Sequence, residues 1–275
     1  MILPELFLPS LAGTVSEYSG LDSPDRCFDQ QYFASYPHPV LYRYNSRGFR
    51  DKEWPNQFDH VIWCVGDSFT HGLGAPQSHA WPAVLQRRTG RRCINVSMDG
   101  ASNNWIACTA LAILTEFPTA DVVLHWSFLH RRELDIAQAL EKKFDFFYNS
   151  VRDPTWPNCE FNQFDQLPQH IQLELTHMHG WTTDIYSNDR VTQYVHSSTV
   201  EDIENTMQCI DALPQHVIHS AIPNWTPPDI AIDGVIVTDQ IDFARDGFHY
   251  DIDTSELLVD KIMSALAGRA SGQAL

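Results

Sequence analysis

Apolar and polar positions alternate along much of the chain in blocks typical of strands and helices. The run "HVIWCVG" at 60–66 is apolar and ends at a glycine, which predicts a buried strand. The segment "HAWPAVLQRRTG" at 79–90 predicts an amphipathic helix that ends at Gly90. The same alternation predicts three further elements, a strand at 91–97, a helix at 103–117 and a strand at 120–128.

The regular alternation pauses at 131 and resumes near 198. The segment "RRELDIAQALEKKF" at 131–144 predicts a helix, and it opens a stretch at about 131–198 that has weak periodicity and reads as an insertion. After this insertion the pattern predicts a helix at 198–213, strands at 216–222 and 233–238, a closing helix at 253–268 capped by Thr254 or Ser255 and ended by Gly268, and a frayed tail.

Strands that alternate with helices indicate a parallel sheet covered on both faces. We therefore expect an α/β protein, a three-layer α/β/α sandwich with a roughly five-stranded parallel sheet, flavodoxin-like in plan. Residues 1–57 are loop-like and predict an N-terminal extension packed on the core, and residues 58–275 form the main domain. In such sheets the chemistry gathers at the carboxyl ends of the strands.

The charge balance narrows the classes of partner. Lys and Arg number 18 and Asp and Glu 35, which gives a net charge of −17, so we expect no nucleic-acid partner. No apolar run reaches the ~18 residues of a membrane span. The start "MILPELFLPSLAG" lacks a basic region, so we expect no signal peptide and a cytoplasmic or otherwise soluble protein.

Cysteine and histidine spacing gives no indication of a metal or cofactor. The six cysteines form no C-x-x-C pair, and we expect buried, reduced thiols. His177 and His179 share one face of an extended segment, but no third ligand accompanies them. We expect no cofactor.

The stretch "VIWCVGDSFTHGLG" places Ser68 at the end of the first predicted strand of the main domain. A serine hydroxyl is a weak nucleophile and needs a base, commonly a histidine that a carboxylate orients. Of the 13 histidines, His249 is the one with an aspartate three residues earlier, Asp246 in "ARDGFHYD". Gly247 allows a tight turn between them, so one short segment can hold base and orienter.

His71 is a competing base, because it lies three residues after Ser68. If Ser68 opens a helix, the two side chains share a face. The alternative is that His71 lines the rim of a pocket or is solvated.

Two motifs resemble those of a known family. "GDSFTHG" resembles the first block of the SGNH (GDSL) hydrolases, and "DGFH" resembles their last block. Between them, "HAWPAVLQRRTGRRCINVSMDGAS" is similar to the corresponding stretch of bacterial lysophospholipase and thioesterase members. The resemblance covers about 45–130 and 199–268. It implies that Ser68 is the nucleophile, that Asp246 and His249 complete the triad, and that Gly100 donates its backbone N–H to an oxyanion hole.

Gly100 also fits this role on physical grounds. The turn "MDGASNNW" follows a predicted strand and opens a helix, so its free N–H groups point outward. The N–H of Ser68 is a second candidate donor. Asn103 and Asn104 are interpreted as residues that start the helix.

The sequence departs from the family in the third block. The family has G-x-N-D after the third strand, with the Asn donating to the oxyanion, whereas this chain has "LHWSFLHRRE". The register leaves Ser127, His130 and Arg131 as substitutes, and we take Ser127 as the working candidate. Arg131, Arg132 and Glu133 either bind a carboxylate or form a structural ion pair at a helix start.

These features predict a serine hydrolase that cleaves carboxylic esters, acetyl or short acyl, on a small molecule or a glycan. One alternative is an acyltransferase that uses the same triad. Another is a catalytically weak glycan-binding or structural module, since the block-three Asn is missing. The insertion is rich in aromatic residues, which suit either a lid and stacking surface or a small satellite core: Phe144, Phe146, Phe147, Tyr148, Trp156, Phe161, Phe164, Trp181 and Tyr186.

Overall fold

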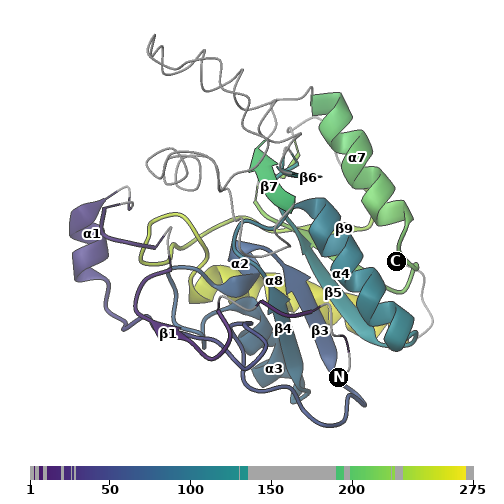
Figure 1. Ribbon diagram of the computed structural model, residues 1–275, viewed down its shortest axis with the longest axis horizontal. Helices are drawn as coiled ribbons and strands as arrows, with labels where there is room; N and C mark the ends of the chain where they lie inside the picture. Colours follow the sequence, from purple (N-terminus) through teal and green to yellow (C-terminus); the bar gives the residue numbers. More distant parts are fainter. Residues whose placement is uncertain are drawn as a thin grey trace.

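A five-stranded parallel sheet forms the centre of the protein, which we describe from a computed structural model (Figure 1). The strands occur in the order β4-β3-β5-β8-β9. Their bounds are β3 Ile62–Gly66, β4 Cys93–Ser97, β5 Asp121–Trp126, β8 Ile218–Ala221 and β9 Val235–Val237. The structure describes residues 3, 6–8, 11–19, 22–25, 27, 29–129, 131–135, 190–194, 199–223, 225–226 and 232–270. The predicted α/β class and parallel sheet are confirmed.

The strand register aligns the carboxyl ends of the three strands that matter for the site. Gly66 at the end of β3 lies opposite Ser97 of β4 and His125 of β5. All five residues of β3 and all five of β4 are buried, which is expected of strands in a parallel sheet that is covered on both faces. The loops that follow these strands therefore emerge together at one edge.

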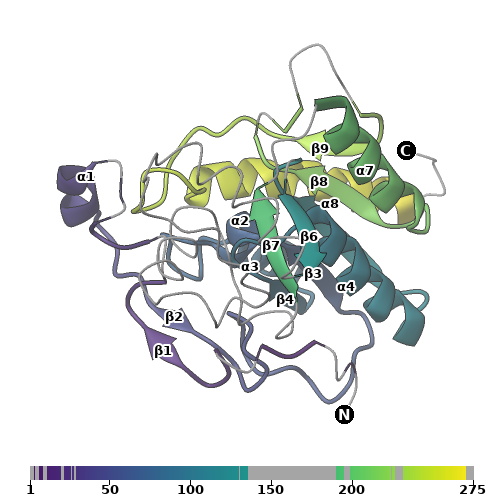
Figure 2. The ribbon, with the colours of Figure 1, turned by 45° about the horizontal axis from the view of Figure 1, so that its top comes forward.

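Helices cover both faces of the sheet (Figures 1 and 2). α3 packs against α8, and α4 packs against α7. The helices span α3 Trp81–Thr89, α4 Asn103–Glu116, α7 Thr199–Asp211 and α8 Ile252–Ala270, with a single turn α2 at Ser68–His71. Gly90 ends α3 in the left-handed conformation, with φ of 68°, as the sequence predicted. Across the part of the chain that the structure describes, no helix is both long and apolar enough to span a membrane.

The N-terminal segment contains short elements that the sequence did not indicate. β1 Val15–Ser16 pairs antiparallel with β2 Tyr42–Arg43, and α1 covers Gln30–Ser35. Figure 2 shows this part to one side of the main sheet. Asp29 caps α1 by accepting a hydrogen bond from the Tyr32 N–H at 2.9 Å.

Two predictions of local structure are wrong. The segment that starts at 131 opens with a strand, β6 Arg131–Asp135, which pairs antiparallel with β7 Arg190–Tyr194. Strand pairing here overrides the helical pattern of the sequence. α8 begins at Ile252, before the predicted cap, and it continues through Gly268. The Thr254 hydroxyl instead accepts hydrogen bonds from the N–H groups of Ile241 and Asp242.

The described cysteines are all free thiols. Cys64, Cys93 and Cys209 are buried, as predicted. The predicted burial is wrong for Cys27, which is half-buried, and for Cys108, which is exposed. Several residues singled out in the sequence lie outside the described residues: Cys159, His130, His177, His179 and the nine aromatic residues of the insertion. In the described part of the chain, no three His, Cys, Asp or Glu residues are grouped so as to hold a metal ion.

Candidate active site

Ser68 is the first residue of the single-turn helix that follows β3. Asp67 caps this turn, and its Oδ1 accepts a hydrogen bond from the Phe69 N–H at 3.0 Å. Gly72 ends the turn with φ of 76°, a conformation that glycine adopts without steric cost. The sharp passage from strand to helix holds Ser68 at the carboxyl end of the sheet.

Asp246 and His249 form one compact turn before α8. Asp246 Oδ1 accepts hydrogen bonds from the N–H groups of Phe248 at 2.9 Å and His249 at 3.0 Å. Its Oδ2 lies 2.6 Å from His249 Nδ1. Gly247, with φ of 71°, makes the turn. The aspartate thus fixes both the backbone and the imidazole of the histidine that follows it.

Two segments that are far apart in the sequence meet at this turn. His249 Nε2 lies 2.8 Å from Ser68 Oγ, although the residues are 181 positions apart in sequence. Ser68 is fully buried, and Asp246 and His249 are 4% and 2% exposed. The carboxylate, imidazole and hydroxyl therefore form a continuous hydrogen-bonded line in which Nδ1 donates to Asp246 and Nε2 is free to accept from Ser68.

The charges around His249 determine its protonation. Burial by itself lowers the pKa of His249, but the carboxylates of Asp246, Asp99 and Asp67 outweigh it and hold this pKa above the usual value. Burial raises the pKa of Asp246, yet the charge of His249 and the hydrogen bonds it receives hold that pKa below its usual value. Both shifts favour the charged forms, so the carboxylates around His249 would stabilise the imidazolium that forms when its ring takes a proton from Ser68.

Gly74 brings the segment that follows Ser68 close to the segment that carries Asp246. Its carbonyl accepts a hydrogen bond from the Arg245 N–H at 2.9 Å, and its own N–H donates to the Tyr42 hydroxyl at 2.8 Å. A Cβ added at Gly74 would lie 2.9 Å from Asp246 Cγ, and φ is +71°. Only glycine allows the two segments to approach this closely.

Ser68 and Gly100 lie just after the ends of the adjacent strands β3 and β4. Among the described residues, neither the Ser68 N–H nor the Gly100 N–H has an acceptor. Gly100 has φ of 76°, and the turn before it is fixed to the end of β3 by a hydrogen bond from the Met98 N–H to the Gly66 carbonyl at 3.1 Å. This places Gly100 beside the strand end that carries Ser68.

Ser127 does not fit the role of the missing third-block Asn. Its hydroxyl is fully buried and donates to Asp67 Oδ2 at 2.6 Å, while it accepts from Arg131 Nη1 at 2.9 Å. Arg131 Nη1 also lies 3.2 Å from Asp67 Oδ2, in an ion pair whose members are at most 2% exposed. The proton of Ser127 is thus directed to a carboxylate and away from an oxyanion.

Asp67 is the residue that sequence reasoning missed. Burial raises its pKa, and the positive charge of Arg131 opposes that rise. Arg131 is in a buried ion pair, but the partner that the structure describes is Asp67, whereas the sequence suggested Glu133. Arg131 also begins a strand and not the predicted helix. The sequence contained one signal for Asp67, because aspartate directly before a helix is a preferred cap.

The remaining candidates have structural contacts. Asn103 starts α4, and its side chain accepts from the Ser127 N–H at 2.8 Å and donates to the Ser127 carbonyl at 3.2 Å. His71 is buried, stacks on Tyr42 and has a pKa well below its usual value because of burial. It makes no hydrogen bond to Ser68, so the hydroxyl's partner in the described structure is His249.

Aromatic rings surround the triad on one side. The ring of Phe69 lies 4.6 Å from that of His249, and the ring of Phe248 lies 5.0 Å from it. Phe128 stacks on Phe248 at 6.3 Å. Phe248 is 39% exposed, so this apolar cluster reaches the surface.

Comparisons with known proteins give only distant structural matches. No protein-family model matches the chain, and no curated protein matches it. Matching solved structures include TesA, with 14% identity, 75% of this chain and 97% of that chain covered, and a TM-score of 0.35. They also include the esterase EstA from Pseudoalteromonas sp. at 12% identity, covering 78% of this chain and 100% of that one, with a TM-score of 0.33.

A third match is AlinE4, an SGNH-hydrolase family esterase, at 13% identity, covering 78% of this chain and 98% of that one, with a TM-score of 0.31. The motifs GDSFTHG and DGFH of this chain resemble those of the SGNH hydrolases. Identities of 14% or less and TM-scores of 0.35 or less leave the chemistry to be read from this chain's own residues.

Proposed function

We propose that this protein is a serine hydrolase that cleaves carboxylic esters through Ser68, His249 and Asp246. One observation carries the proposal, the unbroken hydrogen-bonded line from Asp246 Oδ2 through the His249 ring to Ser68 Oγ, with distances of 2.6 Å and 2.8 Å. A serine buried for structural reasons alone has no need of an imidazole oriented by a carboxylate. The free N–H groups of Ser68 and Gly100 support the same function.

Acylation begins with attack of Ser68 Oγ on the ester carbonyl carbon. His249 Nε2 takes the hydroxyl proton as the C–O bond forms, and Asp246 stabilises the resulting imidazolium. The carbonyl oxygen becomes an oxyanion, which the N–H groups of Ser68 and Gly100 receive. The intermediate then collapses, the bond to the alcohol breaks, and His249 returns its proton to the leaving alkoxide.

Deacylation repeats these steps with water. His249 takes a proton from water, the hydroxide adds to the acyl carbon, and the bond to Ser68 Oγ breaks as His249 protonates it. The products are a carboxylic acid and an alcohol, and the protein returns to its starting state. No cofactor is needed to balance the reaction.

The surroundings of Ser68 favour a short acyl group. Phe69, Phe128 and Phe248 offer an apolar surface beside the imidazole, which suits the hydrocarbon part of an acetyl or short acyl ester. The alcohol part of the substrate is a small molecule or a glycan in this proposal.

Acyl transfer is a second candidate, and the burial of the triad favours it. Ser68 has no exposed surface, and a site from which water is excluded lets an alcohol compete with water for the acyl-enzyme. The reaction is the same up to the acyl-enzyme, and an acceptor hydroxyl then replaces water. Product analysis with and without an added sugar acceptor separates transfer from hydrolysis.

Fluorophosphonate labelling tests the activated nucleophile. We expect a stoichiometric adduct on Ser68, located by peptide mass spectrometry, and its loss in His249→Ala. The matched control is His79→Ala, because His79 Nδ1 lies 2.5 Å from Asp251 Oδ1 in a similar aspartate–histidine pair that holds no serine hydroxyl among the described residues. The control should label fully.

The same proteins should be assayed with p-nitrophenyl acetate. Hydrolysis that disappears in Ser68→Ala and His249→Ala but persists in His79→Ala supports the proposal. A folded wild-type protein that gives neither adduct nor hydrolysis would contradict the proposed hydrolase activity and favour a binding module. Labelling without hydrolysis, with product formed only when an acceptor sugar is present, would favour acyl transfer.

A further inference from the structure

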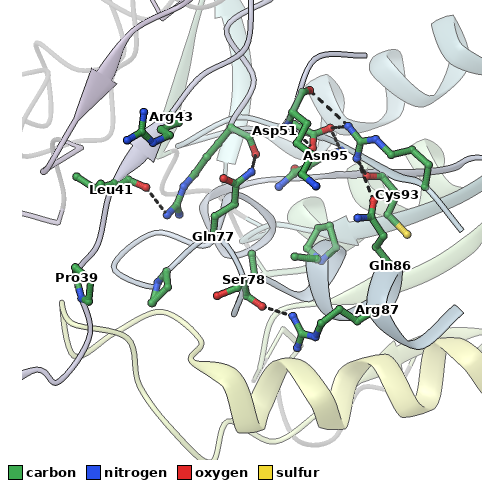
Figure 3. Close-up of a pocket in the computed structure, with 17 residues that line it drawn as sticks. Pro39, Leu41, Arg43, Asp51, Gln77, Ser78, Gln86, Arg87, Cys93 and Asn95 are labelled. Carbon is green, nitrogen blue, oxygen red and sulfur yellow. Dashed lines mark hydrogen bonds and ion pairs between the residues drawn. The ribbon is translucent and has the colours of Figure 1, made fainter. Parts of the chain in front are cut away.

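A pocket that does not include the triad lies between the N-terminal segment and α3 (Figure 3). Its volume is about 490 Å³, within the range of small-molecule sites. Figure 3 shows Pro39, Leu41 and Arg43 on one side and Gln86 and Cys93 on the other. None of Ser68, Asp246 or His249 lines it.

The pocket is basic in an acidic protein. The whole chain has 18 Lys and Arg against 35 Asp and Glu, yet five basic residues and one acidic residue line this pocket: Arg43, Arg50, Lys52, Arg87, Arg92 and Asp51. Such a local reversal of sign attracts anions to a surface that otherwise repels them.

Two of these cations already have carboxylate partners. Arg92 Nη2 lies 2.7 Å from Asp51 Oδ2, and Arg87 Nη2 lies 3.2 Å from Glu256 Oε1. Arg43, Arg50 and Lys52 have no carboxylate within ion-pair distance in the part of the chain that the structure describes. Three positive charges at one pocket therefore lack a counter-ion.

Arg50 is the decisive one of the three, because it is fully buried. Its guanidinium donates to the carbonyls of Leu41 at 3.0 Å and Ala75 at 2.8 Å, and it also contacts those of His71 and Gly72. Carbonyl dipoles do not neutralise a full charge, and a buried cation without an anion is costly. Its Nε has no hydrogen-bond partner among the described residues.

A second buried polar atom at the pocket also lacks a partner. Asn95 is 5% exposed, and its Nδ2 donates to the Thr70 carbonyl at 3.1 Å. This fixes its Oδ1 as an acceptor that finds no donor in the described structure. Of the 14 buried side-chain atoms without a partner among the described residues, Arg50 Nε and Asn95 Oδ1 are the two that belong to residues lining this pocket. A buried polar atom without a partner calls for an explanation, and a bound ligand is one.

We propose that this pocket binds a small phosphorylated metabolite that carries hydroxyl groups. A phosphate monoester has a charge of about −1.5 to −2 at neutral pH and three strong acceptor oxygens. These match the unneutralised Arg43, Arg50 and Lys52, and the free Arg50 Nε. A hydroxyl of the same ligand supplies the donor that Asn95 Oδ1 lacks. The proposal is independent of ester hydrolysis at Ser68.

Isothermal titration calorimetry with glucose 6-phosphate tests the site on the full chain, with glucose as the neutral comparison. We expect saturable binding of one glucose 6-phosphate per chain, at least tenfold tighter than that of glucose, which weakens as salt is added. Absence of saturable binding, or equal binding of glucose and glucose 6-phosphate, overturns the proposal.

The double variant Arg43→Gln/Lys52→Gln locates the binding, because both side chains are exposed and their loss should leave the fold intact. We expect at least tenfold weaker binding. The control is Arg88→Gln/Lys261→Gln, which removes the same two charges from exposed positions outside the pocket. Equal binding in the two double variants, with unchanged melting curves, places the ligand elsewhere and overturns the proposal.

Discussion

The two sides of Ser68 differ in whether their hydrogen bonds reach its hydroxyl. On the base side, His249 has one nitrogen on Asp246 and the other on Ser68 Oγ, so its bonds lead to the nucleophile. On the opposite side, Asp67, Ser127 and Arg131 satisfy one another. We propose that the first group transfers a proton, whereas the second is a buried network that supports the turn at Ser68.

The Ser127 side chain donates to the Asp67 carboxylate that caps the turn at Ser68. In our proposal, the backbone N–H groups of Ser68 and Gly100 therefore stabilise the oxyanion without the third-block Asn of the SGNH pattern. A buried ion pair is costly to break but contributes little net stability. We therefore expect the two sides to respond differently to substitution.

Asp246→Asn should have the largest effect. The amide does not hold the Nδ1–H tautomer, so we expect kcat for ester hydrolysis to fall about 10⁴-fold with little change in melting temperature. Steady-state kinetics with p-nitrophenyl acetate measures it. A loss below about tenfold would mean that His249 does not act as the base, and the contrast between the two sides would fail.

Arg131→Met should act on stability as well as on rate. Removing one partner of a buried pair leaves Asp67 unpaired, so we expect a loss of about 3 kcal/mol in the free energy of unfolding and about 10²-fold in kcat. Denaturant titration and kinetics measure these. The matched control is Arg88→Met, whose ion pairs are exposed, so its free energy of unfolding should change much less.

The double variant Asp67→Asn/Arg131→Met tests whether Asp67 and Arg131 stabilise the protein as a pair. With both charges removed, no buried charge is left unpaired, so part of the lost stability should return. If the double variant is less stable than Arg131→Met by the full cost of the second change, the two residues do not form a unit.

Gly74→Ala should affect the base side through geometry alone. The added Cβ would meet Asp246 Cγ at 2.9 Å and the backbone has φ of +71°, so the aspartate must shift by a few tenths of an ångström. We expect kcat to fall about tenfold. Gly90→Ala is the control, since a Cβ there meets nothing within 4 Å while φ is equally positive, at +68°. Equal activity losses in the two variants would point to backbone strain instead.

The pH profile should show the smallest change. Only neutral His249 accepts the proton of Ser68, and its pKa lies above the usual value, so activity is lost as the pH falls through that raised pKa. In Asp246→Asn, the midpoint of the acid limb of kcat/KM should move down by about one pH unit. An unchanged midpoint would show that another group controls the limb.

The elements that could be predicted from the sequence are those that depend on neighbouring residues. The sheet, the helices from 81 to 116 and the Asp246–His249 turn follow from local apolar runs, glycines and spacing. The network of Asp67, Ser127 and Arg131 did not, because it joins the end of β3 to the segment after β5 across 60 and 64 positions. Pairing of β6 with β7 was missed for the same reason, since its partner lies far along the chain.

The 181 positions between Ser68 and His249 also order events during synthesis of the protein. The strand that carries the serine leaves the ribosome long before the turn that carries the imidazole. A chain that stops short of that turn has a serine without a base, whatever else of it has folded. In the proposed mechanism, any activity that depends on Ser68 therefore requires that synthesis has passed His249, and shorter products are inactive.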